Sequence, residues 1–304
     1  MRLKTKIGDR ANASSEVEYN DAWALMIGEE GKGIKTILQM VQNTRLDCII
    51  GAAGSSRRAI QLALNHTNGR AAFGNKLIKQ PLMENVLADL CITAEACTLS
   101  AIRMCEAFAD SEKGDENAAD LFRIGVAVLK YYCTKLQPNF TYECLEIFGG
   151  NGFVNDFPIS KVFRHSPLNS IWEGSGNVMT LDVLRASNCL PSLLKEVKSS
   201  KGMDSTFDHY IKSLESSLPA ILNQNDTNSI LEVQRAGRYI SDRLALALIG
   251  SIMLRYGHPT TAKAFIQTRL KFNETGFGLN YGSFIHNSAD AQNIIDNNMP
   301  IFYK

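Results

Sequence analysis

The feature that most restricts the fold is a series of three consecutive stretches with helical periodicity. Apolar side chains recur in them at intervals of three and four residues, as they do on the buried face of a helix. The stretches run from 34 to about 66, from 81 to about 109, and from 117 to about 148. At 1.5 Å per residue, each would form a helix about 45 Å long. Such helices predict an up-and-down four-helix bundle, with the fourth helix following Gly176.

The two ends of the chain differ from this bundle. Near the start, alternating residues at 15–19 predict one β-strand without a neighbouring strand. From Asn273 onward, the many Asn and Gly residues predict an irregular end. Between these lies a C-terminal helical region, whose helical patterns cover 205–223, 228–256 and 259–272. We therefore expect a mainly α protein with three parts: 1–30, 31–188 and 189–304.

Composition excludes several classes of protein. Hydrophobic residues make up 45% of the 304 positions and charged residues 21%, so the chain can build a core and is not intrinsically disordered. The formal net charge of +1 argues against a strong general attraction to polyanions.

The sequence also predicts a cellular compartment. No uninterrupted apolar run reaches the roughly 18 residues of a membrane span, and the first residues lack the apolar core of a secretory signal. The seven cysteines are odd in number and form no CxxC pair. We therefore expect reduced thiols, no metal site, no membrane association and a cytoplasmic location.

Glu173 is the side chain best suited to catalysis. It lies between Trp172 and Gly174, in an irregular stretch bounded by glycine clusters inside an otherwise helical chain. Apolar neighbours remove water from a carboxylate, which suits a general base, and a glycine lets a ligand approach the backbone. The alternative is a glutamate at the start of a helix, where it faces the helix dipole.

Two further motifs could bind a nucleotide. Arg70 could form paired hydrogen bonds to a phosphate while Phe73 packs beside a ring. An ordinary surface arginine in a turn between helices would give the same pattern. The glycine run at 149–152 could expose backbone N–H groups to a ligand, or could simply end the third helix.

The order of these motifs is more informative than any one of them. In sequence they are Arg70, Phe73–Gly74, Gln80, the glycines at 149–152, Arg164 and Trp172–Ser175. In this order and spacing, the series resembles the C-terminal helical domain of the acyl-CoA dehydrogenases over about residues 1–188. The segment 169–177 and the extra region 190–304 are most similar to the AidB-like, alkylation-response branch of that superfamily.

The resemblance implies an FAD-dependent enzyme that introduces an α,β double bond into an acyl-CoA thioester and passes hydride to the flavin. Glu173 matches the base that removes the α-proton, and its backbone N–H matches a donor to the thioester carbonyl. Some relatives carry the base on the first long helix, where this chain has Thr44, which cannot act as one. Arg45 matches an arginine near the active site, and Trp172 and Gly174 flank the base.

The implied FAD contacts come from several segments. Arg70 and Phe73 match residues that hold the pyrophosphate and the adenine side of FAD across a dimer interface. The other matching positions are Gln80, Glu146, Gly149, Gly150, Gly152, Ser175 and Asn177. A cofactor shared between subunits implies a dimer, or a tetramer built from dimers.

Departures from the family pattern leave two other functions open. His165 and Pro167 stand where metabolic dehydrogenases have an aspartate and a basic residue, and only the last strand of the family's flavin-covering β-domain is recognisable, at 15–19. We therefore expect weak or absent dehydrogenase activity from this chain by itself, because the chemistry needs a closed site. One alternative is a DNA-binding flavoprotein of the alkylation response, in which Arg185 contacts duplex DNA. The other is an inactive helical oligomerisation domain.

Overall fold

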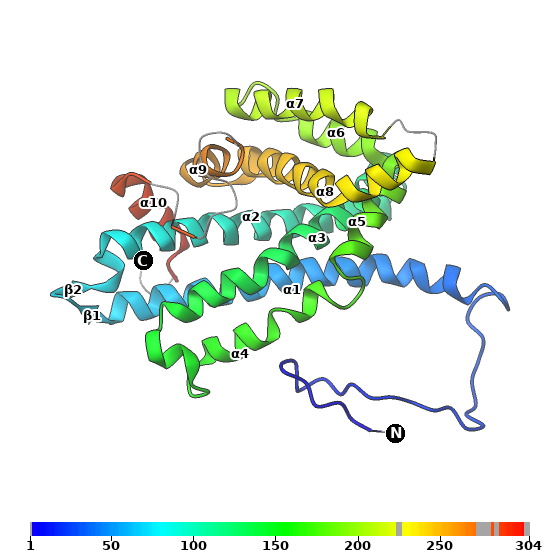
Figure 1. The fold of residues 1–304 in the computed structure, drawn as a ribbon, viewed down its shortest axis with the longest axis horizontal. Coiled ribbons are helices and arrows are strands. Elements are labelled where there is room, and N and C mark those ends of the chain that lie inside the picture. Colours follow the sequence, from blue (N-terminus) through cyan, green and yellow to red (C-terminus); the bar gives the residue numbers. More distant parts are fainter. Residues whose placement is uncertain (1, 223–226, 272–280, 283–285, 301–304) are drawn as a thin grey trace.

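Three long helices lie side by side and form the body of the protein (Figure 1). The computed structural model describes residues 2–222, 227–271, 281–282 and 286–300. The long helices are α1 (Gly33–Gly69), α2 (Pro81–Ser111) and α3 (Glu116–Glu146). Their bounds confirm the prediction to within a few residues. Pro81 begins α2, and the Asp115 side chain accepts a hydrogen bond from the Ala118 N–H at the start of α3.

Shorter helices follow the three long ones. They are α4 (Pro158–His165), α5 (Gly176–Arg185) and α6 (Leu190–Lys198), with the 3-10 turns η2 (Gly149–Phe153), η3 (Leu168–Ser170) and η4 (Ser187–Cys189) between them. The predicted fourth helix is α5, which packs on α3. It places the residues around 173 beside the middle of the bundle.

A small hairpin joins α1 to α2. Its strands β1 (Ala71–Ala72) and β2 (Asn75–Lys76) pair antiparallel, and η1 (Leu77–Lys79) leads into α2. Phe73 and Gly74 at the tip have φ angles of 51° and 83°. Two positive φ angles in a two-residue hairpin loop are typical of a type I′ turn, which glycine adopts readily and phenylalanine does not.

The C-terminal region packs directly on the bundle (Figure 1). It contains α7 (Ser205–Leu222), α8 (Thr227–Tyr256), α9 (Pro259–Arg269) and α10 (Ser288–Asn298). Helix α8 contacts α2, α3, α5 and α6. Gly237 of α8 lies against α5, where an added Cβ atom would be only 2.5 Å from the Thr180 methyl group. Buried apolar residues of both regions belong to one continuous core. The division at 188/189 stays a prediction.

One carboxylate ties this region to the bundle. Glu196 of α6 accepts hydrogen bonds from Arg103 of α2 at 2.7 and 3.0 Å, and from Arg255 of α8. Because the Glu196 side chain is largely shielded from water, these charge-assisted bonds are stronger than surface ion pairs.

Two sequence predictions at the chain ends are wrong. Residues 15–19 form no strand, and Ser15 makes only an isolated antiparallel bridge to Leu3. No second strand among the described residues pairs with this segment, so its backbone cannot build a ladder. The expected irregular end contains α10, which starts where the Asn287 side chain accepts a hydrogen bond from the Asp290 N–H. Residues 272–280, 283–285 and 301–304 lie outside the described residues.

Helix α2 is long and apolar enough to cross a membrane by length and composition. However, 67% of its most apolar window is buried inside the fold, which accounts for its composition. The seven cysteines are all free thiols, and six of them are buried.

Candidate functional site

The turn from Trp172 to Ser175 joins η3 to α5 and carries the predicted base. Glu173 has a φ angle of 58° and Gly174 one of 113°. A left-handed backbone is unfavourable for a residue with a Cβ atom, so the turn needs support from its surroundings. Glu173 lies before α5 begins, and the first turn of α5 contains no acidic residue. Glu173 thus lies two residues before the N-cap residue Ser175, and the helix-start alternative stays open beside the catalytic one.

Two cationic side chains hold this turn by its carbonyl groups. Lys130 of α3, only 1% exposed, donates from Nζ to the carbonyl oxygens of Trp172 at 2.8 Å and Gly174 at 2.5 Å. Arg45 of α1 donates from Nε to the Glu173 carbonyl oxygen at 3.0 Å. Three successive carbonyl groups are thus bound by charged donors from two neighbouring helices, which fixes the strained turn.

Arg45 is itself fixed by a buried carboxylate. Asp182 of α5 accepts from Arg45 Nη1 at 2.8 Å and, in paired fashion, from Arg123 of α3 at 2.8 and 2.9 Å. Asp182 is only 7% exposed. The chain of contacts from α3 through Asp182 and Arg45 to Glu173 therefore connects three helices to one backbone carbonyl.

The ammonium of Lys130 has unusual surroundings. Among the described residues, no carboxylate forms an ion pair with it, and its two hydrogen bonds go to carbonyl groups. Burial lowers the pKa of Lys130 to about 8. Burial also raises the pKa of the nearby Cys48 thiol to about 11. Cys48 is therefore a neutral neighbour of a buried cation at physiological pH.

The Glu173 carboxylate makes no hydrogen bond or ion pair with any described residue, and its side chain is half-buried. Its neighbour Trp172 is held through the indole N–H, which donates to Asn169 at 3.1 Å. Thr44 of α1 donates to the Val41 carbonyl of its own helix, so its hydroxyl is already used. A carboxylate without protein partners on a fixed turn can accept a proton from a ligand.

The predicted site residues fall into two separate groups. The first surrounds this turn: Arg45, Thr44, Trp172, Glu173, Gly174, Ser175 and Asn177. Ser175 is the N-cap of α5 but forms no side-chain cap hydrogen bond. Asn177 accepts a hydrogen bond from Arg238 of α8 at 3.0 Å, so the C-terminal region reaches this group. Arg185 is exposed at the far end of α5.

The second group lies where α1 and α3 end, beside the hairpin (Figure 1). Its members are Arg70, Phe73, Gln80, Glu146, Gly149, Gly150 and Gly152. Phe73 is 96% exposed at the hairpin tip, and Gln80 donates to the Ala72 carbonyl at 3.0 Å. The stacking of His66 on Phe148, with ring centroids 4.3 Å apart, holds the ends of α1 and α3 together.

The glycines of the second group serve different purposes. Gly149 has a φ angle of 58°, and added Cβ atoms at Gly149 and Gly150 would meet nothing within 4 Å, so a ligand could approach their backbone. At Gly152, a Cβ atom would lie 2.2 Å from the Leu145 carbonyl oxygen. Close packing therefore explains Gly152. Gly149 has a positive φ just past the end of α3, so the helix-end alternative stays open for it.

The two groups are too far apart to share one small molecule within a chain. Arg45 and Gly69 are 24 residues apart on α1, which corresponds to about 36 Å along the helix. A single cofactor that contacts both groups therefore requires two chains.

Sequence reasoning missed the residues that hold the turn, which are Lys130, Asp182 and Arg123. Lys130 interrupts the apolar run from Val126 to Cys133. A charged residue inside such a run is rarely buried without a partner, so this position was a detectable signal. No comparable pattern surrounds Asp182, because its partners Arg45 and Arg123 come from helices distant in sequence.

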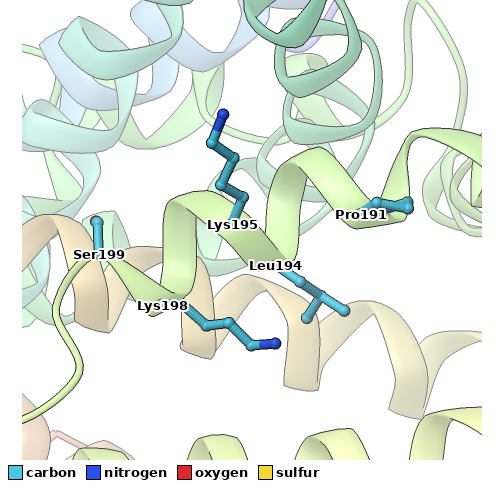
Figure 2. A pocket seen from close by; sticks show the side chains of 5 residues that line it. All are labelled: Pro191, Leu194, Lys195, Lys198 and Ser199. Carbon is cyan, nitrogen blue, oxygen red and sulfur yellow. The ribbon is translucent and has the colours of Figure 1, made fainter.

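A separate open hollow of about 550 Å³ lies on α6 (Figure 2). Pro191, Leu194, Lys195, Lys198 and Ser199 line it. The two ammonium groups point away from each other in Figure 2, so they do not converge on one anion. None of the predicted site residues lines this hollow. Among the described residues, no cluster of three or more His, Cys, Asp or Glu side chains could hold a metal ion.

Comparison with known proteins agrees with this arrangement of helices and motifs. Residues 31–187, slightly more than half of the chain, match the family model of the acyl-CoA dehydrogenase C-terminal domain. The chain belongs to the acyl-CoA dehydrogenase family. Its sequence is 38% identical over 275 residues to the putative acyl-CoA dehydrogenase AidB of Escherichia coli K12, covering 88% of this chain and 48% of AidB.

Solved structures of this family share the fold. The Caenorhabditis elegans protein ACDH-11 in complex with C11-CoA has a TM-score of 0.76 at 24% identity, covering 97% of this chain and 53% of that one. An acyl-CoA dehydrogenase from Bacillus anthracis complexed with FAD has a TM-score of 0.73 at 17% identity, covering 98% of this chain and 56% of that one. The chain thus spans about half the length of its acyl-CoA dehydrogenase relatives.

Proposed function

We propose that this chain carries the proton-abstracting part of an FAD-dependent acyl-CoA dehydrogenase site. The observation that carries the proposal is the Glu173 carboxylate. It has no partner among the described residues and stands on a turn whose carbonyl groups are bound by Arg45 and Lys130. This arrangement leaves the carboxylate available to a substrate while its backbone is held in place.

In the proposed reaction, Glu173 Oε takes the α-proton of an acyl thioester. The electron pair left at the α-carbon forms the α,β double bond, and the hydrogen at the β-carbon leaves as hydride. FAD, when bound, supplies the acceptor for that hydride. The N–H of Glu173 donates to the thioester oxygen, where negative charge develops as the proton leaves. Arg45, which is itself held by Asp182, keeps the Glu173 carbonyl group and therefore the turn in position.

The residues present fit a shared flavin. The hairpin offers an exposed guanidinium at Arg70 and a bare ring at Phe73, which suit a pyrophosphate and an aromatic ring. The turn around Ser175 offers the uncapped N-terminus of α5, which favours negative charge. Because these groups are about 36 Å apart along α1, we propose a dimer in which the hairpin of one chain meets the Glu173 turn of another.

The visible absorbance of the purified 304-residue chain tests flavin binding. We expect a yellow protein that self-associates and is bleached only slowly by an acyl-CoA, and a Glu173→Gln variant that keeps flavin but is not bleached at all. The exposed pair partner Glu232 supplies a control, because Glu232→Gln should bleach like the wild type. Equal bleaching by Glu173→Gln would show that another group is the base. A colourless protein that still self-associates would favour the oligomerisation-domain alternative.

The DNA-binding alternative and a cytoplasmic location stay proposals. The observation relevant to DNA is that Arg185 is exposed at the end of α5 and free to approach a phosphate backbone. Salt-dependent retention of duplex DNA that is lost in Arg185→Ala would favour this function. No retention at low salt would remove it.

A further inference from the structure

Lys130 is an unexpected residue for the interior of a helical bundle. Moving an ammonium group out of water is costly, and an apolar side chain of similar size is often the more stable choice at such a position. The Lys130 ammonium instead donates two hydrogen bonds, and both go to the turn from Trp172 to Ser175. The two accepting carbonyl groups, those of Trp172 and Gly174, lie on either side of Glu173.

The direction of these bonds determines where the N–H groups of the turn point. The described backbone contains no cis peptide bond, and in a trans peptide the C=O and N–H groups point in opposite directions. Since the carbonyl groups of residues 172–174 point at Lys130 and Arg45, the N–H groups of Glu173, Gly174 and Ser175 point away from these cations. No hydrogen bond from these three N–H groups to a described residue is present.

Successive N–H groups around a left-handed residue form a concave donor site for a negatively charged oxygen. A cation at the carbonyl end of each peptide also polarises it, which makes the N–H at the other end a better donor. We propose that Lys130 is a positioning residue: it holds the Trp172 and Gly174 carbonyl groups so that the Glu173 and Ser175 N–H groups face the acyl thioester oxygen.

The identity of the oxygen rests on the proposed function, whereas the holding of the turn does not. The groups that face Lys130 are Arg45 and Cys48 from α1 and Glu173 from the turn. With its pKa at about 8, the ammonium loses its proton above that pH and binds the carbonyl groups more weakly. The thiol of Cys48 stays protonated through that range.

Trp172 reports on the turn directly. The chain contains two tryptophans, and the other one, Trp23, is 84% exposed and far from the turn in sequence. In a Trp23→Phe background, the emission of Trp172 is followed from about pH 6 to about pH 10, a range that spans the pKa of Lys130. We expect one transition near pH 8, no transition in Lys130→Met, and the low-pH spectrum throughout in Lys130→Arg, since arginine keeps its charge.

Two controls make this readout specific. Cys48→Ala should keep the transition, because the thiol titrates at about 11. Lys161→Met removes an exposed lysine of α4 and should also leave the transition unchanged. A transition that survives in Lys130→Met would overturn the proposal. If that variant does not fold, a Lys130→Arg protein that still shows the wild-type transition would overturn it equally.

The second readout uses the FAD-loaded chain and undecanoyl-CoA. In Lys130→Met we expect the rate of flavin bleaching to fall about 10²-fold, with less than about a threefold change in the dissociation constant for the thioester, and partial recovery in Lys130→Arg. An unchanged rate would overturn the role of Lys130 toward the thioester oxygen. If the wild-type flavin is not bleached by any acyl-CoA, the proposed function fails, and the emission of Trp172 still decides whether Lys130 positions the turn.

Discussion

Two turns in this protein share an unfavourable left-handed backbone, but one is held inside the fold and the other is exposed to solvent. In each, a residue with a large side chain precedes a glycine and both have positive φ: Glu173–Gly174 and Phe73–Gly74. The first turn is bound from inside by Lys130 and Arg45. The second projects into solvent with its ring 96% exposed. Contacts within the chain hold the first turn in a fixed geometry, as a catalytic turn requires. The exposed ring of the second turn is typical of a surface that binds another molecule.

The largest effect on stability should come from removing the Asp182 carboxylate, which supports the Glu173–Gly174 turn, called here the inner turn. Asp182→Ala leaves Arg45 and Arg123 facing each other without a counter-charge, so we expect the free energy of unfolding to fall by about 3–5 kcal/mol. Chemical denaturation measures this. Glu232→Ala breaks an exposed pair with Arg235 and should cost less than about 0.5 kcal/mol. Similar losses in both variants would mean that the inner turn has no special support.

Lys130 makes the free energy of unfolding of the whole chain depend on pH. Because its pKa is lowered to about 8 in the folded protein, the unfolded chain binds more protons between that pH and the ordinary lysine pKa. Its contribution to stability therefore rises with pH across this window, by about 3 kcal/mol at most. The unfolding free energy of the wild type minus that of Lys130→Met, measured at successive pH values, should show this rise. A flat difference would contradict it.

The two glycines allow a direct comparison of the turns. At Gly174 an added Cβ atom would lie 3.1 Å from both Val178 and Met179, whereas at Gly74 it would meet nothing within 4 Å. Gly174→Ala should therefore cost about 3 kcal/mol and Gly74→Ala about 1 kcal/mol, the latter from backbone strain alone. Equal costs in thermal or chemical unfolding would mean that surroundings do not distinguish the turns.

The smallest effect on stability should come from the exposed ring. Phe73→Ala removes a side chain that packs on almost nothing within its own chain, so the free energy of unfolding should change by less than about 0.5 kcal/mol. Sedimentation should nevertheless show weaker self-association, since the hairpin is the proposed contact with the second chain. Unchanged association would remove the hairpin from that interface.

The sequence predicted the long helices well because each carries strong periodicity and clear ends, such as Pro81 and Asp115. It singled out Glu173 as a candidate base because the residues around it are unusual in a helical chain, and that role stays a prediction. The strand at 15–19 failed because alternation shows only that a segment could pair, not that a neighbour exists. Helix α10 was missed because the polar residues that cap it, such as Asn287, are also typical of loops.

The support of the turn could not be predicted in the same way. Lys130, Arg45 and Asp182 come from three different helices, and their contacts depend on how those helices pack. Periodicity identifies which face of a helix is buried, but a buried cation that binds backbone carbonyl groups leaves no complementary charge in the sequence. The separation of the two groups of implied flavin contacts likewise depends on α1 being one continuous helix from Gly33 to Gly69, which the sequence pattern predicts only approximately.

The carboxylate of Glu196, shared by Arg103 and Arg255, couples the unfolding of the helices that it connects. It joins α2, α6 and α8, whose buried apolar residues belong to one continuous core. Helix α8 should therefore not open by itself as an independent foldon. Its slowest amide protons should exchange with solvent only through the same global opening that exposes α2, with equal free energies and equal dependence on denaturant.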